Sequence, residues 1–181
     1  SNLPYRELLG ALLWLSRTVR PDITFFVNLL SRYSTCYTEQ HFKQLKQVLR
    51  YVLTTADVNL QYRTARPLKT DASLLIEIYV DSDWAGDRAD YKSYSGVCVF
   101  VNKHLVNWLS KKQDTQSLSS AEAEYMAITE AVKEALQTFF LLSELVKIQL
   151  PMILYVDNKA AIDLSSNYSN NARTKHIDIR Y

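Results

Sequence analysis

Two segments that lie far apart in this chain end in the same order of residues, an apolar residue followed by Tyr, Val and Asp. The first is the apolar, β-branched run from Leu74 to Asp81, and the second runs from Met152 to Asp157. Both patterns predict strands that finish in an acid. Side chains at the strand ends of an open α/β sheet point into the crevice where ligands bind. One such aspartate is more often a turn former, but the repeated pattern favours a site formed by Asp81 and Asp157.

A long helix is expected between these two strands. Its apolar residues step by three or four positions over about seven turns, and Ser119 or Ser120 can cap its start. These residues are Ala121, Tyr125, Ile128, Val132, Ala135, Phe139, Leu142 and Val146. With about 100° per residue, Glu124 falls at the edge of the apolar face, whereas Glu122, Glu130 and Glu134 fall outside it.

Further strands and a helix are expected around these elements, in the C-terminal part of the chain. Strands are expected from Ser95 to Phe100 and from Leu105 to Leu109, with the turn between them near Asn102 and Lys103. The second Asp-ending strand is followed by a short helix from Lys159 to Leu164, a polar loop from Ser165 to Asn171 and a possible strand from His176 to Ile179. This order of elements predicts an α/β layer with a mixed sheet.

Three acids therefore stand out as candidate metal ligands: Asp81, Glu124 and Asp157. An acid that faces a core is costly unless its charge is compensated, and no Lys or Arg shares the face of Glu124 in the same turns. A divalent cation shared with the strand-end aspartates would compensate it; otherwise Glu124 simply reaches solvent at the sheet margin. Oxygen-only ligands favour Mg²⁺ or Mn²⁺ over Zn²⁺. Two such ions would support hydrolysis of a phosphodiester.

The N-terminal part of the chain has a different pattern and a different charge. Residues 1–57 predict three helices, and residues 58–73 a polar linker with a possible short strand before a second domain at residues 74–181. Residues 1–70 carry ten Lys and Arg against four acids, whereas residues 71–181 carry eleven against fifteen. On the third helix, Lys43, Lys46 and Arg50 form a basic stripe. The stripe is either a solvated helix face or a weak nucleic-acid-binding surface.

Composition excludes several other classes of protein. Three glycines leave no glycine-rich phosphate-binding loop. Two cysteines provide neither a thiolate zinc site nor a disulfide framework. No apolar run approaches the roughly 20 residues that span a bilayer, and no signal peptide opens the chain, so we expect an intracellular protein without a membrane partner.

At these acids the sequence resembles a known family. Six segments occur in order: YVDSDWAGD (Tyr79 to Asp87), KSYSG (Lys92 to Gly96), WLSKKQ (Trp108 to Gln113), SSAEAEYMAI (Ser119 to Ile128), LYVDNKAAI (Leu154 to Ile162) and RTKHIDIRY (Arg173 to Tyr181). Together they resemble the ribonuclease H domain of Ty1/copia-type retrotransposon Pol polyproteins. The segments from Tyr5 to Tyr33 and from His41 to Leu53 resemble the reverse transcriptase thumb or connection that precedes that domain.

The resemblance implies a ribonuclease H-like mixed sheet with flanking helices, preceded by a small three-helix segment. It matches Asp81, Glu124 and Asp157 to the catalytic metal ligands, with Asp83 a secondary candidate. It further implies an enzyme that hydrolyses the RNA strand of RNA–DNA hybrids with Mg²⁺ or Mn²⁺, leaving a 3′-hydroxyl and a 5′-phosphate. The remainder of a Pol polyprotein would be a partner, and the location would be cytoplasmic, in a virus-like particle, or nuclear.

The chain departs from the family pattern at its C-terminal end. The family has a fourth carboxylate after one more strand, whereas the last acid here, Asp178, lies too early by the motif. The ribonuclease H fold is therefore expected to be incomplete, with an edge or face that a protein partner or a second copy would cover. His176 is expected to be structural. The alternative function is a non-catalytic module, derived from a retroelement, that binds protein or nucleic acid.

Overall fold

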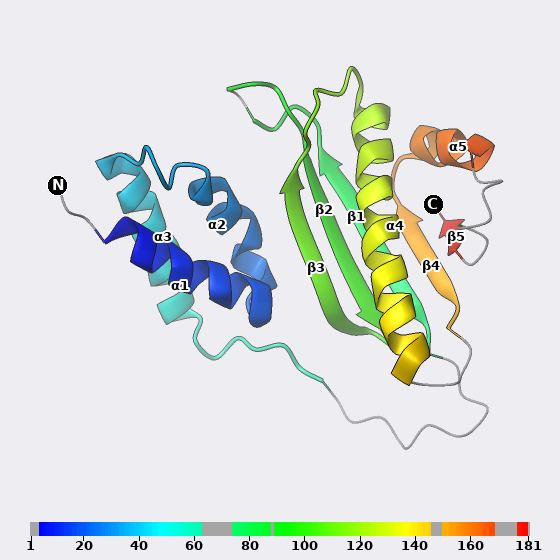
Figure 1. The fold of residues 1–181 in the computed structure, drawn as a ribbon, viewed down its shortest axis with the longest axis horizontal. Helices are drawn as coiled ribbons and strands as arrows, with labels where there is room; N and C mark the ends of the chain where they lie inside the picture. Colours follow the sequence, from blue (N-terminus) through cyan, green and yellow to red (C-terminus); the bar gives the residue numbers. More distant parts are fainter. Residues whose placement is uncertain (1–3, 63–73, 88, 146–149, 169–176, 181) are drawn as a thin grey trace. The chain divides into compact units, whose positions relative to one another are not determined.

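The computed structural model of this chain describes residues 4–62, 74–87, 89–145, 150–168 and 177–180. The chain divides into two compact units, Ser1–Gln61 and Tyr62–Tyr181 (Figure 1). Most of the predicted linker, residues 63–73, lies outside the described residues. The short strand expected there therefore stays an expectation.

The first unit is helical, as its sequence pattern predicts. It contains α1 (Tyr5–Thr18), the 3₁₀ helix η1 (Pro21–Ile23), α2 (Thr24–Ser31) and α3 (Glu39–Thr54). Their apolar faces share one buried cluster: Tyr5, Leu9, Leu12, Ile23, Val27, Leu30 and Leu45. Thr38 caps α3, because its hydroxyl accepts a hydrogen bond from the backbone N–H of His41 at 3.4 Å.

The second unit is built on a five-stranded mixed sheet. The strands are β1 (Ile76–Asp83), β2 (Tyr94–Val101), β3 (His104–Lys112), β4 (Met152–Val156) and β5 (Ile177–Arg180). Their order across the sheet is β3-β2-β1-β4-β5. The three strands that come first in the chain pair antiparallel, and β4 is parallel to both β1 and β5. The parallel pairing of β1 with β4 requires a crossover, and the long helix α4 (Ser120–Leu145) provides it.

Helix α4 lies across one face of the sheet, beside α5 (Lys159–Tyr168) (Figure 1). The angle predicted for its buried face is wrong. The buried residues are Ala123, Glu124, Ala127, Ile128, Ala131, Ala135 and Thr138, so Glu124 lies within the buried face and not at its edge. Alanine has the small side chain that lets a helix approach a sheet closely, whereas the sequence pattern follows the larger apolar residues.

Two further details differ from the sequence prediction. Glu130 and Glu134 are half-buried, because α4 packs near β3: Glu130 pairs with Lys111, and Glu134 accepts a hydrogen bond from Asn107 at 2.6 Å. Helix α5 continues to Tyr168, so the first four residues of the segment expected to be a loop, 165–168, are helical. Serine and asparagine weaken a helix, but neither removes a backbone hydrogen bond as proline does. None of the described helices is long and apolar enough to cross a membrane.

The turn between β2 and β3 lies at Asn102 and Lys103, as predicted, and both residues have positive φ, 48° and 68°. This is the conformation of a tight hairpin turn that favours Asn followed by Gly. Lys103→Gly should therefore stabilise the second unit by about 0.5–1 kcal/mol. Urea denaturation of a Trp14→Phe background measures this, because Trp84 and Trp108 then report on the sheet unit. A loss of stability in Lys103→Gly would contradict the interpretation that the positive φ of Lys103 strains the backbone.

Candidate metal centre

The two repeated Tyr-Val-Asp segments lie side by side in the sheet. Strands β1 and β4 are parallel, with Tyr79 opposite Tyr155 and Val80 opposite Val156. The two tyrosine rings stack, with centroids 4.7 Å apart and planes 13° from parallel. Because residues in equal register of a parallel pair point to the same face, the next residues of both segments, Asp81 and Asp157, emerge next to each other.

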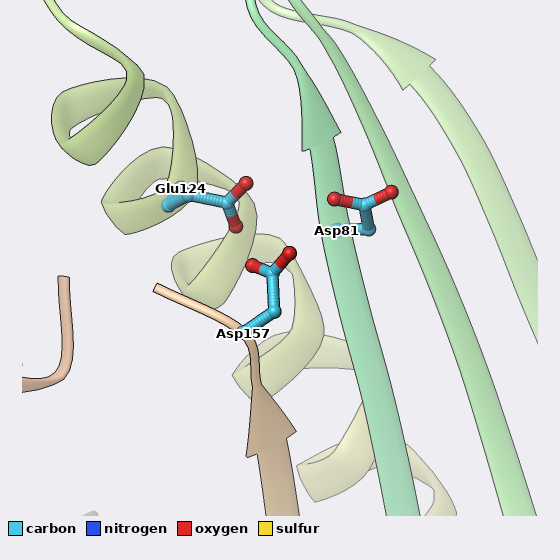
Figure 2. A group of neighbouring side chains, drawn as sticks. All are labelled: Asp81, Glu124 and Asp157. Atoms are coloured by element: carbon cyan, nitrogen blue, oxygen red, sulfur yellow. The ribbon is translucent and has the colours of Figure 1, made fainter. Parts of the chain in front are cut away.

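Glu124 joins these two aspartates from α4. Its side chain is only 5% exposed, whereas Asp81 and Asp157 are exposed. Carboxylate oxygens of Asp81, Glu124 and Asp157 all lie within 4.8 Å of one another. Figure 2 shows the three carboxylates pointing toward a common space from β1, from α4 and from the residue that follows β4. The structure thus brings together the three acids that the sequence selects.

Ser82 holds one oxygen of Glu124. Its backbone N–H and its hydroxyl donate to Glu124 Oε1 at 3.1 and 2.9 Å. The same backbone N–H also donates to Asp81 Oδ1 at 2.8 Å. Glu124 Oε2 is buried and has no hydrogen-bond partner among the described residues. A buried carboxylate oxygen without a partner is costly, and a bound cation would satisfy it.

No positively charged side chain among the described residues pairs with the carboxylates of Asp81, Glu124 and Asp157. Burial raises the pKa of the Glu124 carboxyl above its ordinary value, the hydrogen bonds from Ser82 oppose this shift, and the negative charges of Asp157 and Asp81 add to it. The oxygen-only donor set and the unpartnered Oε2 therefore fit Mg²⁺ or Mn²⁺.

The raised pKa of Glu124 makes a prediction about stability and pH. A carboxyl whose pKa is higher in the folded state contributes less to stability as the pH rises above its unfolded pKa, because the folded state must then lose a proton that it holds more tightly. Glu124→Gln removes this loss. Without divalent cations the variant should be more stable than the parent at pH 7, and the difference should shrink below a pH of about 4.

Urea denaturation in EDTA across this pH range measures the difference. Glu144→Gln is the control, because Glu144 lies on the same helix with an exposed side chain. A Glu124→Gln variant less stable than the parent at pH 7 would contradict the electrostatic account.

No other candidate acid whose side chain the structure describes belongs to this group. Asp83 ends β1, and its carboxylate lies over Gly86, where an added Cβ would collide with it. Asp178 lies in β5 opposite Ile153 of β4, and His176 lies outside the described residues. Lys43, Lys46 and Arg50 are exposed on α3 of the first unit. Sequence reasoning does not single out Ser82; its only signal is its place directly after Asp81.

The sequence has clear relatives, although no family model matches it. It is 38% identical over 178 residues to the retrovirus-related Pol polyprotein from transposon RE1 of Arabidopsis thaliana, covering 98% of this chain and 12% of that protein. It is 35% identical over 181 residues to the Pol polyprotein from transposon TNT 1-94 of Nicotiana tabacum, covering 100% and 13%. It is also 40% identical over 134 residues to secreted RxLR effector protein 161 of Plasmopara viticola, covering 74% and 90%.

A solved structure is also similar, but only weakly. LC11-RNase H1, isolated from compost, aligns with a TM-score of 0.37 and 16% identity over 59% of this chain and 82% of its own. The fold assignment therefore rests on the sheet topology and on the sequence relatives.

The order and directions of the five strands, with three acids gathered where the parallel pairing of β1 with β4 ends, define a ribonuclease H-like domain. The relatives identify its origin. The chain belongs to the family of retrovirus-related Pol polyproteins from copia-type transposons. Both the family and the fold class predicted from sequence are confirmed. The chain spans only 12–13% of the length of the Pol polyproteins it matches.

Proposed function

We propose that this chain is a metal-dependent ribonuclease H that hydrolyses the RNA strand of RNA–DNA hybrids during reverse transcription of a copia-type element. The observation that carries the proposal is the group of three carboxylates within 4.8 Å of one another, one of them buried with an unpartnered oxygen. The family of the relatives supports the substrate class. The remainder of a Pol polyprotein would then be the partner of the chain.

The roles of the three acids follow from their exposure. Asp81 and Asp157 face solvent, so their carboxylates would hold Mg²⁺ or Mn²⁺ on the side that a phosphodiester can approach. Glu124 closes the buried side and has Oε2 left over as a ligand. Two bound ions would supply activation of a water molecule and stabilisation of the leaving oxygen. In the reaction, water oxygen bonds to phosphorus, the bond from phosphorus to the 3′-oxygen breaks, and that oxygen takes up a proton.

The proposal is tested with duplexes of one sequence: an RNA–DNA hybrid, an RNA duplex and a DNA duplex. With Mg²⁺ we expect cleavage of the RNA strand of the hybrid alone, yielding 5′-phosphate and 3′-hydroxyl ends, and no cleavage in EDTA. Cleavage that persists in EDTA, or that is equal for hybrid and RNA duplex, would overturn the proposal.

One observation favours a second candidate function. The Plasmopara viticola relative, 90% of which aligns with this chain, is named a secreted effector and not a polyprotein. A related segment of this size is thus known under another role, which suits a non-catalytic module that binds protein or nucleic acid. Binding of the hybrid without cleavage, together with no change in thermal stability on adding Mg²⁺, would favour this function.

The basic stripe on α3 is proposed to hold nucleic acid. Lys43, Lys46 and Arg50 are all exposed; Lys43 pairs with Glu39 at 3.4 Å, and Lys46 Nζ lies 5.0 Å from the centre of the Phe42 ring. Replacing all three with Gln should weaken hybrid binding and reduce the slope of log affinity against log salt by about 2 to 3, if each contacts one phosphate. Fluorescence anisotropy at several salt concentrations measures the slope.

Arg17→Gln on α1 is the matched control for this variant, because it removes an exposed cation from another helix of the same unit. An unchanged slope in the triple variant would show that the stripe is only a solvated face.

A further inference from the structure

Two polar tethers join the sheet to the first turns of α4. In the first, Ser82 of β1 donates to Glu124 Oε1 through its backbone and its hydroxyl. In the second, Gln113, which follows β3, donates from Nε2 to Ser95 Oγ of β2 at 3.0 Å and to the Ala123 carbonyl of α4 at 2.8 Å. Ser82 and Ser95 are opposite each other in the pairing of β1 with β2. The two tethers therefore start from neighbouring positions of the sheet and end on consecutive residues of the helix.

The second tether is specific to an amide side chain. Gln113 is only 6% exposed. Its nitrogen must face Ala123, because a backbone carbonyl can only accept a hydrogen bond. Two N–H donors on one nitrogen allow it to bind strand and helix at once, whereas Gln113 Oε1 is buried without a partner in the described structure. Burying an oxygen without a hydrogen-bond partner costs free energy of folding. That this cost is tolerated indicates that the two hydrogen bonds from Nε2 are more important than a partner for Oε1.

The first tether determines which oxygen of Glu124 remains for a ligand. Both donors of Ser82 converge on Oε1, and the backbone N–H is shared with Asp81 Oδ1. One N–H thus lies between the carboxylates of two different elements and fixes their spacing. Oε2 is left without a donor among the described residues, and Figure 2 shows that the Glu124 carboxylate is directed toward the carboxylates of Asp81 and Asp157.

We propose that Ser82 and Gln113 are positioning residues of the metal centre: Ser82 orients the Glu124 carboxylate, and Gln113 fixes the turn of α4 that carries it. The inference rests on the proposed function. Residues that orient metal ligands without touching the metal affect metal affinity by about 10- to 100-fold. Neither residue needs to touch the substrate.

The test compares Ser82→Ala and Gln113→Met with a matched control. Asn107→Ala breaks a similar bond between the sheet and α4, to Glu134, which is not one of the three acids. Binding of Mn²⁺ alone, followed by the electron paramagnetic resonance of the free ion, gives affinity without any reaction. We expect Ser82→Ala and Gln113→Met each to weaken Mn²⁺ binding at least about 10-fold, and Asn107→Ala to leave it within about twofold while lowering stability in urea.

Ser82→Thr keeps the hydroxyl and should restore binding to within about threefold of the parent. Parental Mn²⁺ affinity in Ser82→Ala or in Gln113→Met would overturn the role of that residue. If Asn107→Ala weakened Mn²⁺ binding as much as Ser82→Ala and Gln113→Met do, Ser82 and Gln113 would only stabilise the fold in general. Asp81→Asn separates this inference from the proposed function. If this variant binds Mn²⁺ as tightly as the parent, the three acids are not a metal centre, and the proposed function is refuted independently of the results for Ser82 and Gln113.

Discussion

Asp81→Asn should lower the rate of hybrid cleavage by at least about 100-fold. Metal ions stabilise the charge of such a transition state by several kcal/mol, and each 1.4 kcal/mol corresponds to about tenfold in rate. Asparagine keeps the size of the side chain and an oxygen that can accept from the Ser82 N–H, so the fold should be retained. The variant should also lose most of the thermal stabilisation that Mg²⁺ gives the parent. Single-turnover cleavage and thermal denaturation with and without Mg²⁺ measure the two effects.

Asp83→Asn is the matched control for this experiment. Asp83 lies on the same strand, is also exposed and lies outside the group of three acids. It should cleave at a rate within about threefold of the parent, because an exposed acid outside the metal centre contributes little. Equal losses in both variants would contradict the assignment of Asp81, and an unchanged rate in Asp81→Asn would refute the metal centre.

Leu154→Ala should destabilise the sheet unit by about 2–5 kcal/mol. Leu154 lies in the middle of β4, opposite Ile78 of β1, and is 1% exposed within the main apolar cluster. Its removal loses buried apolar surface and leaves a cavity that the neighbouring strands cannot fill without losing their pairing. Urea denaturation in the Trp14→Phe background measures the loss.

Leu141→Ala provides the comparison, since the Leu141 side chain is 60% exposed on α4. Its effect should stay within about 0.5 kcal/mol. Similar losses at both positions would mean that the cluster is not the main source of stability of this unit.

The sequence predicts much of the metal centre because its acids are marked by regular patterns. Asp81 and Asp157 each come directly after a Tyr-Val pair, and these pairs lie at equal register in the parallel strands β1 and β4. Strand β1 continues for two residues beyond Asp81, to Asp83, whereas β4 ends at Val156, so only Asp157 follows its strand as the pattern predicts. Glu124 is marked as the one glutamate near the apolar face of a long helix. Carboxylate oxygens of the three acids lie within 4.8 Å of one another. The sequence alone does not show this proximity, because it depends on the pairing of β1 with β4 and on the packing of α4.

What the sequence could not predict depends on close packing between elements. The buried face of α4 follows a row of alanines, Ala123, Ala127, Ala131 and Ala135, whose small size carries little weight in a pattern of apolar residues. The tethers of Ser82 and Gln113 join residues with no periodic relation to their partners. Such polar contacts are fixed only when the backbone positions of two elements are known.

The three acids lie on segments that are translated at different times. This order affects when the metal centre can form during synthesis of the protein. Chains emerge from the N-terminus and fold by units as they do so. Asp81 and Glu124 are translated well before Asp157, and Asp157 joins them only when β4 inserts beside β1. A nascent chain that stops before β4 would therefore lack one of the three acids, so the nuclease activity proposed for this chain would be absent from incomplete translation products that are still attached to their own messenger RNA.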